Sequence, residues 1–222
     1  MFAKPDIRTV DPQALAALGA KVRPTAASRT RLLPVAGPLA PLLPDGGLRR
    51  GTAVVCAGEA ALSLALAMAG AASAAGSWCA LAGVEDPGLL AAAGYGVDLA
   101  RLAVVRTAPA GWATATATLL DGLDLVVVEP PAHPRAAAAR QLAARARDRG
   151  SVLVVVGGRR SWPAPADVEL TVGEPRWHGL AEGAGRLQAR RVSVSSAGRG
   201  AAARPVRREL WLPAATGAVA AA

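Results

Sequence analysis

The side chains that could bind a metal ion or act as nucleophiles are few and widely spaced in this chain. The thiols and imidazoles are Cys56, Cys79, His133 and His178, separated by 23, 54 and 45 residues. Zinc sites use ligands in closely spaced pairs, and no serine lies in the G-x-S-x-G pattern of a hydrolase nucleophile elbow. We therefore expect no metal site and no catalytic nucleophile, and interpret both cysteines as small buried apolar residues of a reduced protein.

The segment that begins at Gly58, directly after the apolar run 52–57, is the candidate for phosphate chemistry. Phosphate-binding loops follow G-x-x-x-x-G-K-[ST]. The glycines let N–H groups converge on phosphate oxygens, the lysine neutralises them and the hydroxyl holds Mg²⁺. The corresponding residues here are Gly58, Glu59, Ala60, Ala61, Leu62 and Ser63. The second glycine and the lysine are missing, no lysine occurs after Lys21, and Glu59 puts a negative charge where a phosphate would sit. We therefore expect a degenerate loop and no cofactor, with only Ser63 and backbone amides left for residual nucleotide binding.

Arginine and tryptophan recur together in the C-terminal third. The candidate partner-binding residues are Trp177, Arg190, Arg191, Arg207, Arg208 and Trp211. These two residue types are enriched at protein-binding hot spots and also stack on nucleobases. Trp211 alternates with Leu210 and Leu212, so on a strand it faces away from both. We expect it to contact a partner, with packing beneath the C-terminal tail as the alternative.

Positive charge is confined to one half of the sequence. The formal net charge is +9; residues 1–132 hold ten basic and ten acidic residues, whereas residues 133–222 hold fifteen arginines and six acids. Codon usage of a GC-rich genome explains the preference for arginine over lysine, but not its placement. A basic half indicates an acidic partner, either nucleic acid or an acidic protein surface.

Short apolar runs alternate with helix-compatible segments in the first two thirds of the chain. Strands are predicted at 52–57, 78–82, 102–107, 123–128 and 151–156, and helices at 60–75, 87–93, 113–120 and 135–149. Continuous apolar strands separated by helices are typical of a parallel sheet covered on both faces. The uncharged stretch 60–84 is then a buried helix and strand, and not a membrane span.

The pattern changes from about residue 166. Apolar and polar residues alternate there, which predicts antiparallel strands with one solvated face. The phase of this alternation slips at Arg190–Arg191, as it does at a bulge.

We divide the chain into three parts. Residues 1–45 form a short helix at 12–20 and a Pro/Gly-rich linker, residues 46–212 form the α/β domain, and residues 213–222 form a disordered tail. The N-terminus shows no signal peptide, so we expect a cytoplasmic protein without membrane attachment.

Several segments, in the right order, resemble proteins with a RecA-like core. Gly46–Gly51 is similar to the turn before the first core strand, Gly76–Leu81 to the second strand, Gly96–Leu102 to the approach to the third, and Leu123–Glu129 to the Walker B strand. The resemblance spans roughly residues 38–160 and implies an α/β fold with a mostly parallel central sheet plus antiparallel C-terminal strands. It also places Glu129 where a Walker B carboxylate would order Mg²⁺. With no phosphate to hold the metal, we interpret Glu129 as vestigial and Glu85–Asp86 as a solvated turn.

Among RecA-like proteins without a working phosphate loop, the chain most resembles the ImuA-type mutagenesis accessory proteins, in particular the short ImuA-prime form. The supporting segments are Gly46–Gly51, Trp177–Leu180 and Arg207–Pro213. The resemblance implies a non-enzymatic accessory role in SOS mutagenesis and translesion DNA synthesis. The implied partner is an ImuB-like relative of the Y-family polymerases and, through it, an error-prone replicative-type polymerase. It also implies association with the nucleoid after DNA damage.

Two other roles stay open on the sequence alone. The arginine-rich half permits a recombination accessory that binds DNA directly, which would bind with a steep salt dependence. A cell-division inhibitor of the SulA kind is also a RecA-like relative without a phosphate loop, and it would bind a tubulin-like division protein. A nucleotide-hydrolysing enzyme is the class that the degenerate loop argues against.

Overall fold

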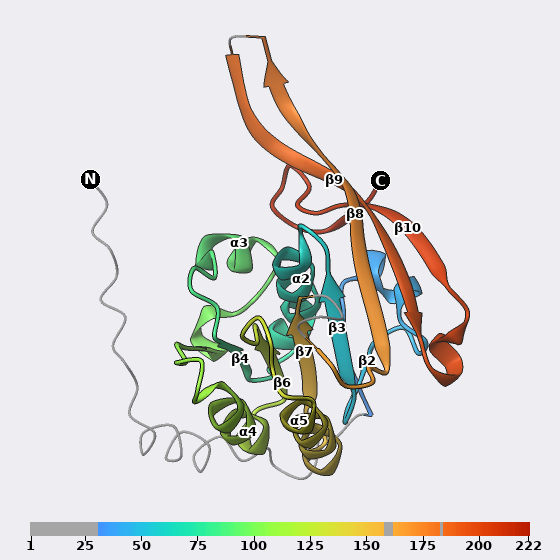
Figure 1. Ribbon diagram of the computed structural model, residues 1–222. Coiled ribbons are helices and arrows are strands. Elements are labelled where there is room, and N and C mark those ends of the chain that lie inside the picture. Colours follow the sequence, from blue (N-terminus) through green and yellow to red (C-terminus); the bar gives the residue numbers. More distant parts are fainter. Residues whose placement is uncertain (1–30, 158–161, 183) are drawn as a thin grey trace, which may run out of the picture.

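A single mixed sheet forms the centre of the computed structural model, which describes residues 31–157, 162–182 and 184–222. In this described part the strand order of the main sheet is β11-β10-β9-β8-β3-β7-β6-β4-β5 (Figure 1). The helix expected at 12–20 lies outside the described residues. The predicted fold class, with a mostly parallel core and antiparallel C-terminal strands, is confirmed.

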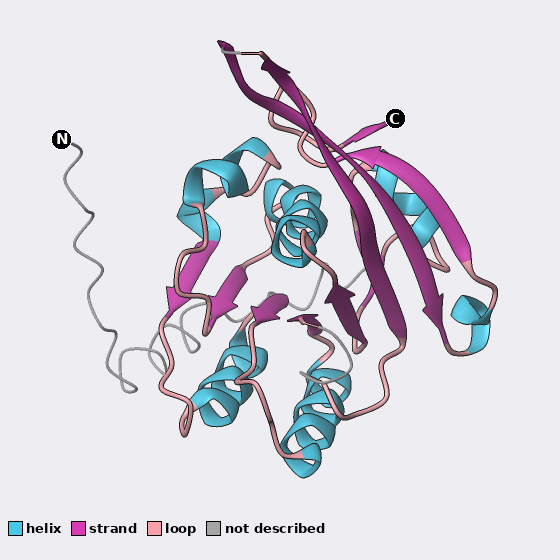
Figure 2. Cartoon of the chain, turned by 45° about the horizontal axis from the view of Figure 1, so that its top comes forward, coloured by secondary structure: helices cyan, strands magenta, loops and turns pink. Residues whose placement is uncertain are grey.

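The parallel half of the sheet is close to the sequence prediction. Its strands are β3 (Ala53–Ala57), β4 (Cys79–Ala82), β5 (Leu102–Val105), β6 (Leu125–Val128) and β7 (Val152–Val156), all paired in parallel. The helices between them are α2 (Ala61–Ala74), α3 (Leu89–Gly94), α4 (Trp112–Gly122) and α5 (Ala136–Arg149). Figure 2 shows α2 and α3 on one side of the sheet and α4 and α5 on the other. This two-sided cover explains why the strand sequences are continuously apolar.

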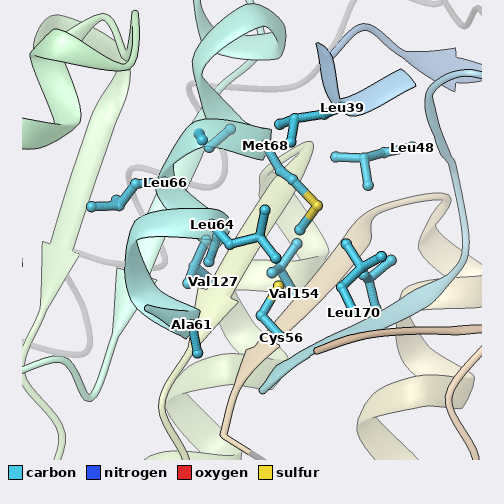
Figure 3. Close-up of a cluster of buried hydrophobic side chains, with 14 of the residues drawn as sticks. Leu39, Leu48, Cys56, Ala61, Leu64, Leu66, Met68, Val127, Val154 and Leu170 are labelled. Atoms are coloured by element: carbon cyan, nitrogen blue, oxygen red, sulfur yellow. The ribbon is translucent and has the colours of Figure 1, made fainter. Parts of the chain in front are cut away.

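Helix α2 occupies the middle of the larger core. Leu64 and Met68 are fully buried and face the strands, where alternate residues such as Cys56 and Val154 point toward the helix (Figure 3). Because α2 is apolar around its whole circumference, it is stable only when covered on nearly all sides. The uncharged stretch is therefore a buried helix and strand, as predicted. Among the described residues, no helix has both the length and the apolar character needed to cross a membrane.

The C-terminal strands continue the sheet. They are β8 (Val168–Ala181), β9 (Ala184–Gly198), β10 (Val206–Trp211) and β11 (Ala220–Ala221). β8 pairs in parallel with β3 only over Val168–Thr171, and then runs on beside β9 in antiparallel register. The distal parts of β8 and β9 project beyond the core as a two-stranded ribbon, orange at the top of Figure 1. We call its residues 174–192 the arm.

The N-terminal boundary predicted at residue 45 is wrong. Residues expected to be linker form β1 (Leu32–Leu33), which pairs with β2 (Leu48–Arg49), and the 3-10 helix η1 (Gly37–Leu42). Leu33, Leu39 and Leu42 are buried in the same core as α2. Proline fixes the backbone without a helical hydrogen-bond pattern, so the Pro-rich composition hid a segment whose leucines are packed.

The C-terminal segment 213–222 is ordered, and the prediction of a disordered tail is also wrong. It turns at Ala214–Ala218, where the Ala214 N–H donates to the Ala218 carbonyl at 2.7 Å, and returns to pair β11 with β10. Its small residues allow close packing: a side chain at Gly94 would come within 3.3 Å of the Gly217 carbonyl oxygen. Low complexity here reflects tight packing of the backbone against α3.

The bulge expected on the strand carrying Arg190–Arg191 lies on the opposite strand instead. The ladder register shifts between Gly173 and Arg176 of β8, where Glu174 has a φ of +55°. The next residue, Pro175, has no N–H to give to the ladder, so β8 accommodates the extra residue there.

A buried ion pair explains the arginine in the turn before the first core strand. The Arg50 guanidinium donates to Asp124 Oδ1 at 2.8 Å and to the Gly150 carbonyl at 3.2 Å, and Asp124 Oδ2 accepts from the Trp78 N–H at 3.0 Å. These contacts tie the entries of several strands together at the amino edge of the sheet. The role of Arg50 is therefore structural.

Candidate functional site

The turn from β3 to α2, where a phosphate loop would lie, is short and tight. Gly58 has a φ of +96°, and a side chain there would come within 2.0 Å of the Val172 carbonyl oxygen. The Ala61 N–H donates to the Gly58 carbonyl at 3.1 Å, so the helix starts almost at once. Glu59 is exposed, and no side chain caps the helix start at Ala60. This turn has no loop that could wrap a phosphate.

Arg190 of β9 fills the space beside the first turn of α2. One Nη of its guanidinium donates to Ser63 Oγ at 2.7 Å and Nε donates to the Leu212 carbonyl at 2.7 Å, while the group lies 5.0 Å from the centre of the Trp177 ring. A cation at a helix N-terminus is opposed by the helix dipole, and these acceptors and the ring offset that cost. A guanidinium of the chain itself thus lies against Ser63 in the first turn of α2.

Tyr95 and the C-terminal segment close the same edge. Burial raises the pKa of Tyr95, and interactions with Ser63 and Arg190 partly offset the rise. The Arg190 N–H donates to the Pro213 carbonyl at 2.8 Å, and the Leu212 N–H donates back to the Arg190 carbonyl at 2.7 Å. In Figure 1 the red C-terminal segment loops over α2 toward α3. In open α/β sheets, nucleotides bind at the edge formed by the carboxyl ends of the strands. The C-terminal segment 213–222 covers part of this edge above α2.

Glu129, interpreted above as vestigial, lies near Glu85 and Asp86 of the expected solvated turn, beside α4 and away from Arg190. Glu85, Asp86 and Glu129 are exposed and line a cleft of about 480 Å³, with Thr107 and Trp112 on its wall. Arg106 lines an adjoining hollow that shares Glu85 and Thr107 with this cleft.

The thiols and imidazoles stay apart. Cys56 and Cys79 are both buried, and burial raises the pKa of each thiol. His133 is exposed, whereas His178 meets Trp211 edge-on, with ring centroids 4.9 Å apart. Among the described residues, no group of three or more His, Cys, Asp or Glu side chains could hold a metal ion.

The predicted partner-binding residues divide between the two faces of the C-terminal sheet. Trp177 and Arg190 lie opposite each other on the face toward α2, where Arg190 is engaged in the contacts above. Arg191 and Trp211 form a cross-strand pair on the outer face, and Arg207 lies on the same face four residues before Trp211 on β10. Leu210 and Leu212 are buried in the core while Trp211 is partly exposed, so the predicted orientation of Trp211 is confirmed. Arg208 is exposed.

Ion pairs connect the outer-face charges. Arg207 contacts Glu174 at 2.9 Å and Glu209 at 3.8 Å, and Arg191 contacts Glu209 at 3.5 Å. All four side chains are at least 40% exposed, so these pairs contribute little stability. They hold a charged surface in one arrangement around Trp211.

The sequence interpretation missed Arg176 and overstated the charge of the antiparallel strands. Residues 133–165 hold seven arginines and one acid, whereas residues 166–222 hold eight arginines and five acids. Most of the excess therefore lies in α5 and the segment after β7. Arg176 lies directly opposite Arg191, and the run Arg176-Trp177-His178 was the available signal for it.

The fold is that of a RecA-like α/β domain, and at this edge Arg190 contacts the first turn of α2. The crystal structure of the RadB recombinase is similar, with a TM-score of 0.58 and 14% identity, covering 82% of this chain and 95% of that one. At that identity the likeness concerns the fold alone. Residues 41–164 match the family described as the MT3502 N-terminal domain, and the chain belongs to this family. It is also 36% identical to the uncharacterised protein Rv3395c of Mycobacterium tuberculosis over 168 residues, which are 71% of this chain and 80% of that protein.

We expect calorimetry with ATP and Mg²⁺ to show no saturable binding at about millimolar nucleotide, the weakest range such titrations resolve. The lysine and the second glycine are missing, and Arg190 holds Ser63 Oγ. The Arg190→Ala variant serves as the control. It opens the position without supplying the missing groups, so it should also fail to bind. ATP hydrolysis that survives purification and is lost in Ser63→Ala would contradict this expectation.

Proposed function

We propose that this protein is a non-catalytic accessory factor of SOS-induced mutagenesis and translesion DNA synthesis. Its partner would be an ImuB-like homologue of the Y-family polymerases, which in turn recruits an error-prone replicative-type polymerase. The observation that carries the non-catalytic part is Arg190 at the helix start where a nucleotide phosphate would bind. A RecA-like core that cannot hold a nucleotide retains its use as a rigid support for binding surfaces.

The outer face of the C-terminal strands is the surface that we assign to the protein partner. Trp211 is its centre, with Arg191 beside it on β9 and Arg207 further along β10, whereas Arg208 lies on the other face of β10. A partly exposed tryptophan surrounded by charged residues has the composition of a hot spot with a polar rim. On this face the His178 ring of β8 packs against Trp211 of β10 across β9, and on the other face Trp177 and Arg190 contact each other. The protein would act in the cytoplasm and gather at the nucleoid after DNA damage.

The experiment is affinity purification of the tagged chain, at its native expression level, from cells with and without DNA damage. We expect an ImuB-like protein to be enriched in a stoichiometric amount after damage. Each purification is repeated with the tag alone as the control. Recovery of a tubulin-like division protein instead would support the SulA-like role and contradict the proposal.

A further inference from the structure

The part of the arm nearest the core places three arginines and a tryptophan on two adjacent rungs. Arg176 lies directly opposite Arg191, and Trp177 lies directly opposite Arg190. We call these four residues the arm root. Like charges directly opposite each other destabilise an antiparallel pair. Glu209 contacts Arg191 at 3.5 Å, but within the described residues Arg176 has no carboxylate partner. An anion between the two guanidinium groups would remove their repulsion.

Trp177 adds an aromatic surface on the other face of the same two strands. Its side chain is 44% exposed, and the Arg190 guanidinium covers one side of the ring at 5.0 Å. Hydrogen bonds to Ser63 and Leu212 fix that guanidinium in turn. The ring is therefore held in place with apolar surface open to solvent. A planar ligand that stacks on it would bury this surface at little conformational cost.

The outer edge of β8 is open along the arm, because β8 leaves β3 after Thr171. Addition of a partner strand to this edge is disfavoured by Pro175 and by the register shifts on either side of Trp177. A ligand must therefore be recognised by side chains. Arg176 and Trp177, as consecutive strand residues, flank the edge on opposite sides. A nucleotide likewise carries its phosphate and its base on opposite sides of the sugar.

From this arrangement we propose that the arm root binds single-stranded nucleic acid. A phosphate lies between Arg176 and Arg191, and a base stacks on the open surface of Trp177. Bases in a duplex are already stacked on each other, so a single strand is the preferred form. The role goes beyond the protein-partner function, since the purified chain alone should show it.

The test is fluorescence anisotropy of a labelled oligothymidylate of about 20 nucleotides, long enough to exceed typical single-strand site sizes. Arg176→Glu should weaken binding at least tenfold, and Arg176→Ala should lower the slope of log affinity against log salt by about one. The matched control is Arg140→Glu, which makes the same charge change at an exposed position of α5. It should leave affinity within about twofold.

Stacking is tested separately. Trp177→Ala should lose about tenfold in affinity and Trp177→Phe much less, because a phenyl ring still stacks. Circular dichroism must show that each variant is folded. The proposal is overturned if Arg140→Glu loses as much affinity as Arg176→Glu, or if the Phe and Ala variants are equally weak. It is also overturned if polyglutamate of equal charge displaces the oligonucleotide as well as unlabelled oligothymidylate does, since an acidic polypeptide would then be the ligand.

Discussion

Val126→Asp is expected to prevent the domain from folding. Val126 is completely buried in β6, which pairs on both sides, with β4 and with β7. Its side chain points to the core formed with α4 and α5, where Leu120 and Leu142 are also buried. An unpaired carboxylate there costs several kcal/mol, of order half the stability of a typical domain. The strand has no solvated face to which the chain could shift the charge.

Circular dichroism and thiol labelling measure this outcome. Cys56 and Cys79 are buried in the native fold, so a thiol reagent should label neither in the wild type and both in the variant at neutral pH. Ala144→Asp, at an exposed position of α5, introduces the same residue and should lose less than about 1 kcal/mol. A soluble Val126→Asp variant with wild-type melting and protected thiols would show that the placement of β6 is wrong.

The parallel half of the fold was predictable because burial on both faces leaves a direct record in sequence. Strand β6 reads Leu125–Val128 without a polar residue, and such runs need no knowledge of distant partners. The end of helix α5 was also recorded locally in the sequence. Gly150 ends α5 with a φ of +68°, a conformation that glycine favours.

The chain ends were mispredicted because their order depends on contacts that composition does not encode. Leu39 and Leu42 are separated by proline and carry no periodic pattern, yet the core needs them to cover α2. In the same way, Gly217 lies close to Gly94 because neither residue has a side chain. A pattern of small residues predicts disorder as readily as close backbone packing.

In the candidate site, too, the features recorded in local sequence could be predicted, and those that depend on distant contacts could not. The missing lysine and glycine were visible in sequence, so the loss of the phosphate loop could be predicted. That Arg190 fills the position could not, because Arg190 and Ser63 lie 127 residues apart. Alternation on the strand gave the outward face of Trp211. It could not show that His178, two strands away, packs against the Trp211 ring.

Trp211→Ala is expected to weaken binding of an ImuB-like partner by about thirtyfold or more, which corresponds to ~2 kcal/mol for a hot-spot tryptophan. Trp211 pairs across the ladder with Arg191 on β9 and its ring meets His178 on β8, so a partner that covers Trp211 also desolvates the Arg191 guanidinium. The double reversal Arg207→Glu with Arg208→Glu should mainly slow association and change its salt dependence, because both side chains are exposed at the rim. Surface plasmon resonance with an immobilised ImuB fragment separates the two rates.

Truncation after Gly200 is no test of this interface, because it removes Leu210 and Leu212 from the core. The matched control is Trp112→Phe, which alters a buried tryptophan next to the acidic cleft and should leave partner affinity unchanged. Trp211→Phe should recover part of the loss, since a phenyl ring can still meet His178 edge-on. If folded Trp211→Ala and the double reversal both bind like the wild type, the partner does not use the outer face. The exposed leucines at the far end of the arm, Leu180 and Leu187, would then be the next surface to test.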